Sequence, residues 1–150
     1  MVSGWDAGPN DVNLAWCLGL VIPSELAVIF IDEYAVDDGD QRDFIDVVGA
    51  RLRLEWTKLG GFSIHIVDQS VFTKSCVADG KSMADTMRQH GMAPMGGEVS
   101  FAERRKSVND LLTRNFKTAD GRFVPRWRVH ERCELLIEAM TGGYVYSRAN

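Results

Sequence analysis

Cysteine, proline and long apolar runs are scarce in this chain of 150 residues. The three cysteines, Cys17, Cys76 and Cys133, are an odd number without metal-ligand spacing, so the sequence indicates neither a disulfide framework nor a zinc site. No apolar run approaches the roughly 18 residues of a membrane helix, because Gly19 and Pro23 interrupt the longest one. The N-terminus has no basic segment followed by an apolar one, which a secretion signal requires. These absences predict a protein that stays in the cytoplasm and does not enter a membrane.

The overall composition, 45% hydrophobic and 25% charged residues, is that of an ordinary globular protein. We expect one domain over residues 1–150, the usual size of a single core. The net charge of −4 hides an asymmetry, because residues 1–75 carry 5 basic and 12 acidic side chains, whereas residues 76–150 carry 12 and 9. An acidic part that can hold metal cations and a basic part that can hold phosphates would suit a nuclease. A solvated surface with chance asymmetry explains the charge equally well.

Apolar runs separated by turn residues predict three strands near the N-terminus, at Val2–Asp6, Asn13–Val21 and Leu26–Asp32. Short turns between them favour an antiparallel meander. A helix with one apolar face should follow and end at Gly60, where a fourth strand, Phe62–Val67, comes next. Because a helix separates the third and fourth strands, we expect the fourth to lie parallel beside the first.

Further elements alternate between helix and strand. We expect a short helix at Ser82–His90, a loop at Met92–Gly97, a helix at Phe101–Asn115 and a fifth strand at Arg126–Val129. This strand should lead into a helix that carries Cys133 and Met140 on one face and ends at Gly142, and an extended piece should follow at Tyr144–Tyr146. The order βββαβααβα predicts an α/β protein with a central mixed five-stranded sheet flanked by helices, in which strand one lies between strands two and four. This is the RNase H-like order.

Asp6 and Asp68 each end an apolar strand. If the two strands are parallel neighbours, their carboxylates meet at one edge of the sheet. Paired carboxylates are the oxygen ligands that Mg²⁺ and Mn²⁺ prefer, and two such ions can organise phosphodiester chemistry. The alternative is that each aspartate accepts hydrogen bonds within the following turn. His65, in the middle of the fourth strand, is expected to be packed rather than catalytic.

Asp32 and Glu33 are adjacent on the third strand, so their side chains point to opposite faces and only one can reach the site. A solvated strand end is the alternative for either residue.

Several short landmarks occur in an order that matches a known family. They are Gly4-Trp5-Asp6-Ala7-Gly8, Phe30-Ile31-Asp32-Glu33-Tyr34, Val67-Asp68-Gln69-Ser70, the segments from Glu103 to Leu112 and from Trp127 to Ile137, and Gly142-Gly143-Tyr144-Val145-Tyr146. On this ordered set the chain resembles the C-terminal RNase H-like nuclease domain of the large terminase subunit of tailed bacteriophages.

The resemblance implies a metal-dependent endonuclease that cuts concatemeric viral DNA, with Asp6, Asp68 and Glu33 as catalytic residues and Asp6 and Asp68 as ligands of Mg²⁺ or Mn²⁺. Its implied partners are double-stranded viral DNA, the terminase ATPase domain, the portal and the small terminase subunit, in an infected bacterial cell. The chain has no G-x-x-x-x-G-K-[ST] loop, so no ATPase is expected. In the family a third carboxylate usually follows the tyrosine-containing strand, and the chain stops at Asn150 before that point. We therefore expect a fragment.

Basic residues gather between residues 102 and 132, with nine basic side chains against four acidic ones. They could contact the phosphates of a DNA duplex, which adds affinity without sequence choice, or simply form a solvated face. The candidates for DNA contact are Arg104, Arg105, Lys106, Arg126 and Arg128.

Other functions stay open. A catalytically incomplete terminase module could bind DNA or motor partners without cutting, since a third carboxylate is not evident. Other RNase H-like enzymes, such as junction resolvases, share the geometry of the site. Half of an actin-like sugar kinase is disfavoured, because it needs a second Asp-x-Gly strand and a Gly-Gly adenosine loop.

Overall fold

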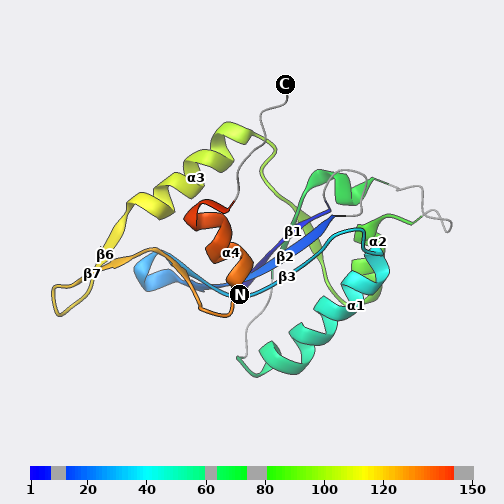
Figure 1. Ribbon diagram of the computed structural model, residues 1–150, viewed down its shortest axis with the longest axis horizontal. Coiled ribbons are helices and arrows are strands. Elements are labelled where there is room, and N and C mark those ends of the chain that lie inside the picture. The colour runs from blue at the N-terminus through cyan, green and yellow to red at the C-terminus, as the bar shows by residue number, and fades with distance from the viewer. Residues whose placement is uncertain (8–12, 60–63, 74–80, 144–150) are drawn as a thin grey trace.

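The computed structural model describes residues 1–7, 13–59, 64–73 and 81–143. Within these ranges, six strands form one mixed sheet in the order β5-β4-β1-β2-β3-β8, and helices lie against it (Figure 1). The protein is therefore of the α/β class, as the sequence predicted.

The first three strands form the expected antiparallel meander. Strand β1 (Val2–Asp6) pairs with β2 (Leu14–Ile22), which pairs with β3 (Ala27–Val36). A short 3₁₀ turn, η2 (Pro23–Glu25), joins β2 to β3. Strand β3 continues four residues past its predicted end at Asp32, because the chain keeps its pairing with β2 as far as Val36.

Two parallel strands extend this meander on either side. Strand β4 (Ile64–Val67) lies parallel to β1, so β1 is placed between β2 and β4 as predicted. Strand β8 (Trp127–Val129) lies parallel to β3 and corresponds to the predicted fifth strand.

The predicted loop at Met92–Gly97 is wrong, and with it the expected total of five strands. Its central residues form β5 (Pro94–Gly96), an edge strand parallel to β4. Three residues are too few to show an alternating apolar pattern, and a leading proline reads as a turn signal in sequence although edge strands tolerate it.

Helix α1 (Gln41–Arg51) is the helix predicted after the third strand, and it begins after Asp40 because the Asp40 side chain accepts hydrogen bonds from the backbone N–H groups of the first turn. It continues through a π-helical turn, η3 (Leu52–Trp56), and a 3₁₀ turn, η4 (Thr57–Leu59). The predicted stop at Gly60 lies outside the described residues.

Helix α2 (Met83–Gln89) confirms the predicted short helix. Ser82 and Asp85 form a capping box at its start, in which each side chain bonds the backbone N–H of the other. A 3₁₀ turn, η5 (Gln69–Phe72), follows β4.

The core lies between α1, α2 and one face of the sheet. Trp5 of β1 contacts Trp16 of β2 and Phe44 of α1 edge to face, and Tyr34 of β3 stacks on Phe44. Because side chains alternate along a strand, the neighbours of Trp5, namely Gly4 and Asp6, point to the opposite face.

Helix α3 (Phe101–Thr113) and a β-hairpin extend away from the six-stranded sheet (Figure 1). The hairpin pairs β6 (Asn115–Lys117) with β7 (Phe123–Pro125) and was not predicted. The feature of the sequence that indicates this hairpin is the Asp120-Gly121 dipeptide in its turn. Gly121 adopts a φ of 85°, a backbone conformation that favours glycine.

Helix α4 (Glu134–Glu138) is shorter than predicted and continues as a π-helical turn, η6 (Ala139–Gly143). The chain turns at Gly142, whose φ is 105°. The extended piece expected at Tyr144–Tyr146 lies outside the described residues.

Candidate metal site at the strand ends

Asp6 and Asp68 lie side by side at the ends of neighbouring parallel strands. Trp5 of β1 is opposite Val67 of β4, so the next residue of each strand is an aspartate. The backbone N–H of Asp68 donates to the carbonyl of Trp5 at 3.4 Å, which holds the two ends together. Adjacent strands are about 4.8 Å apart, so two carboxylates at this position can share a ligand. The predicted parallel placement of the two strands is confirmed, and both aspartate side chains are exposed.

The Asp68 carboxylate is also the cap of the turn that follows. Its Oδ1 accepts a hydrogen bond from the backbone N–H of Ser70 at 2.9 Å, at the start of η5. The hydrogen bonds from the Ser70 backbone and side chain lower the pKa of Asp68, and the positive charge of Arg104 adds to this effect. The carboxylate is therefore ionised at neutral pH, the state in which a carboxylate binds a metal.

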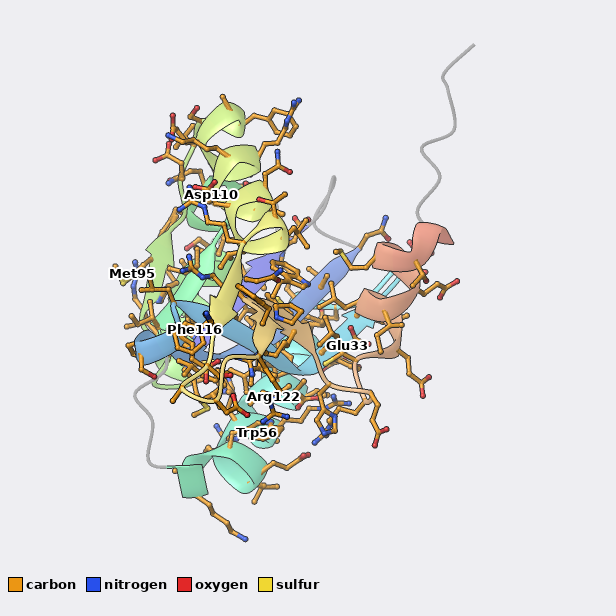
Figure 2. All side chains as sticks on the ribbon, turned by 90° about the vertical axis from the view of Figure 1, so that its left-hand side faces the viewer. Glu33, Trp56, Met95, Asp110, Phe116 and Arg122 are labelled. Atoms are coloured by element: carbon orange, nitrogen blue, oxygen red, sulfur yellow. The ribbon has the colours of Figure 1, made fainter. Side chains whose placement is uncertain are left out.

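Glu33 has a different partner. Its Oε1 and Oε2 accept hydrogen bonds from the backbone N–H groups of Leu135, at 2.6 Å, and Leu136, at 2.9 Å. The N-cap residue of α4, Cys133, makes no side-chain cap, so Glu33 supplies one from β3. Figure 2 shows Glu33 beside this helix. Among the described residues, Asp6, Asp68 and Glu33 do not form a group of three metal ligands.

Asp32 points to the opposite face from Glu33, as the alternation along the strand predicted. Its side chain is buried and accepts a hydrogen bond from Trp56 Nε1 at 2.9 Å. The guanidinium groups of Arg51 and Arg132 lie 3.5 and 3.6 Å from Asp32 Oδ1. These partners compensate the negative charge of the buried Asp32 carboxylate. Through them Asp32 connects β3 to the end of the α1 region and to the segment before α4.

The basic residues fall into two groups. Arg104, Arg105 and Lys106 are exposed on the first half of α3, and the charge of Arg104 reaches Asp68. Arg126 and Arg128 are half-buried beside the far edge of the sheet.

Arg128 is not available to a phosphate in this conformation, because its guanidinium pairs with Glu25.

Helix α3 runs from the first group of basic residues toward the second. Its 13 residues span about 20 Å at ~1.5 Å per residue, and its end contacts the stretch before β8 through a hydrogen bond from Arg126 N to the Arg114 carbonyl at 3.3 Å.

Glu98 is a further carboxylate near this edge that the sequence reasoning did not single out. Gly96 of β5 lies opposite Val67, so the chain leaves β5 through Gly97 and Glu98 on the same side as Asp68. The Glu98 Oε1 accepts a hydrogen bond from the backbone N–H of Ser100 at 2.8 Å, just before α3. Its position follows from β5, which the sequence did not reveal.

Two histidines near the sheet, His65 and His130, have hydrogen-bond partners in the structure. His65 is buried, as predicted, and its Nδ1 lies 2.8 Å from Ser3 Oγ. His130 is exposed after β8, and its Nδ1 accepts a hydrogen bond from the backbone N–H of Arg132 at 3.3 Å.

Comparisons with known proteins leave the family open, since the chain matches no protein-family model, no curated protein and no solved structure. Within the described ranges, no helix combines the length and the apolar character needed to span a membrane.

Proposed function

We propose that the chain is an RNase H-like, metal-dependent DNA endonuclease domain of a phage terminase large subunit. The observation that carries the proposal is the pairing of Asp6 and Asp68 at the ends of β1 and β4. The strand order around β1 and the ordered sequence landmarks add support.

In this proposal Asp6 and Asp68 together hold Mg²⁺ or Mn²⁺. The residues fit such an ion, because two exposed carboxylates on adjacent strand ends repel each other and a divalent cation relieves that repulsion. A bound ion would supply an activated water and would stabilise the leaving oxygen.

The protein's own part is to position the DNA. Arg104, whose charge already reaches Asp68, would hold a phosphate next to the two carboxylates. Arg105 and Lys106, which are exposed on the same helix, would contact phosphates further along the duplex. Glu33 would act indirectly by fixing α4 on the sheet, and Arg128 by its ion pair with Glu25.

A plasmid-cleavage assay with Mn²⁺ tests this proposal. We expect slow cleavage by the chain and none by Asp6→Asn or Asp68→Asn, with the fold of each variant confirmed by circular dichroism. The matched control is Asp43→Asn, which removes an exposed carboxylate from the first turn of α1, the helix that packs on the other face of the sheet. Cleavage that survives either strand-end substitution would refute the assignment.

The second candidate is a terminase module that binds a partner without cutting. Helix α3 supports it, because large apolar side chains on and near this helix are exposed. They are Met95, Val99, Phe101, Val108 and Leu112. Mn²⁺ binding without cleavage would favour this candidate over the nuclease.

A further inference from the structure

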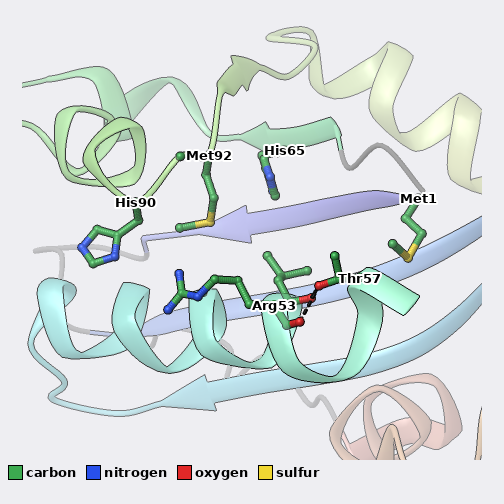
Figure 3. Close-up of a pocket in the computed structure, with 9 residues that line it drawn as sticks. Met1, Arg53, Thr57, His65, His90 and Met92 are labelled. Carbon is green, nitrogen blue, oxygen red and sulfur yellow. Dashed lines mark hydrogen bonds between the residues drawn. The ribbon is translucent and has the colours of Figure 1, made fainter. Parts of the chain in front are cut away.

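A pocket of about 190 Å³ lies between the α1 region, β4 and the segment after α2 (Figure 3). It faces the side of the sheet on which Trp5 and Ser3 are packed, whereas Asp6 points to the other side. The pocket is smaller than the roughly 300–1,000 Å³ of sites for drug-sized ligands. Any ligand must therefore be small.

A chain of buried hydrogen bonds reaches His65, which lines this pocket. Trp5 Nε1 donates to Ser3 Oγ at 2.8 Å, and Ser3 Oγ lies 2.8 Å from His65 Nδ1. An indole N–H can only donate, so the serine oxygen accepts from Trp5, and its own proton can be donated to His65 Nδ1. Nδ1 is then the acceptor, and the proton of the neutral imidazole sits on Nε2.

The Nε2–H of His65 is a donor without a partner among the residues that the structure describes. The residue is only 5% exposed, and burial lowers its pKa, so the ring is held in the neutral form. The Nε2 atom is not sealed from solvent, because the pocket that His65 lines gives access to it. A ligand in the pocket can therefore place an acceptor on the Nε2–H in the position that water would otherwise take.

The other described residues around the pocket favour an anion with a short apolar part. Nine described residues line the pocket, His65 included, and none of them is acidic. Arg53 supplies a guanidinium group. Met1, Leu52 and Met92 supply apolar surface, and Met92 is buried. In Figure 3, Arg53, His65 and Met92 lie around the same opening.

We propose that this pocket binds a small organic carboxylate. Its oxygens accept hydrogen bonds from His65 Nε2–H and from the Arg53 guanidinium, and its hydrocarbon part lies against Leu52 and Met92. The site does not depend on the proposed nuclease activity, because it uses the opposite face of the sheet.

A titration with butyrate, followed by NMR of the ¹⁵N-labelled full chain, tests the proposal. Without ligand, the imidazole ¹⁵N shifts of His65 should show the proton on Nε2. Butyrate should shift the Nε2 resonance with saturation, and the neutral analogue butyramide should bind about tenfold more weakly or worse, as expected for a charge-assisted hydrogen bond. Inorganic phosphate serves as a second arm and should bind more weakly than butyrate, because it has no apolar part.

Two surface variants make the test specific. Arg53→Gln should weaken butyrate binding about tenfold, whereas Lys58→Gln, which removes an exposed cation that does not line the pocket, should leave it unchanged. Equal melting temperatures would confirm that both variants are folded. The absence of a saturable shift, equal binding of butyramide, tighter binding of phosphate, or full binding by Arg53→Gln would each overturn the proposal.

Discussion

The carboxylate of Glu33 accepts a 2.6 Å hydrogen bond from the backbone N–H of Leu135, which lies 102 residues further along the chain. This bond and its neighbour to Leu136 attach the start of α4 to β3. The interaction explains why a short helix with no cap of its own is held against β3.

Replacement of Glu33 by alanine should therefore lower stability. We expect the free energy of unfolding, measured with urea, to fall by about 1–2 kcal/mol, the usual effect of losing a helix cap. The matched control is Glu131→Ala, which removes an exposed carboxylate just before α4 and should change stability little. An unchanged stability in Glu33→Ala, or loss of Mn²⁺ binding in a folded Glu33→Gln variant, would contradict the capping role.

His65 should make stability fall at acidic pH. Burial lowers its pKa from the ordinary value of 6.5 in the folded protein, so the unfolded chain holds more protons between pH 6.5 and the lower folded value. The free energy of unfolding should fall as the pH drops through this window. In His65→Gln this part of the slope should disappear, which urea unfolding at several pH values between 5 and 8 would measure. An identical pH dependence in the variant and the wild type would show that His65 is not responsible.

DNA binding should separate the two groups of basic residues. If Arg104, Arg105 and Lys106 each contact a phosphate, replacing all three by alanine should reduce the slope of log K against log salt by about 3. Arg128→Ala should leave the slope unchanged and instead lower stability, because its guanidinium already pairs with Glu25. Fluorescence anisotropy with a labelled duplex at several salt concentrations measures both. An unchanged slope in the triple variant would show that this face of α3 is only solvated.

The sequence predicted the meander, α1 and the position of β4 because these elements carry long apolar patterns. It therefore predicted correctly that the strands before Asp6 and Asp68 are parallel neighbours. It missed β5, whose three residues carry no pattern, and hence the position of Glu98.

Tertiary partners could not be read from the local sequence. The bond from Glu33 to α4 joins residues more than 100 positions apart, and so does the ion pair between Glu25 and Arg128. Both interactions depend on which elements pack together. From the sequence alone, Glu33 was therefore interpreted as catalytic and Arg128 as free to bind phosphate.

The most direct test of the account is a double-mutant cycle on Mn²⁺ binding, measured by calorimetry with the wild type, Asp6→Asn, Asp68→Asn and the double variant. If both carboxylates hold the same ion, each single substitution should weaken binding about tenfold or more, and the double variant should bind little worse than either single variant. Asp43→Asn should bind like the wild type. Full Mn²⁺ binding by either strand-end variant, or losses that simply add in the double variant, would contradict the claim that Asp6 and Asp68 form one metal site.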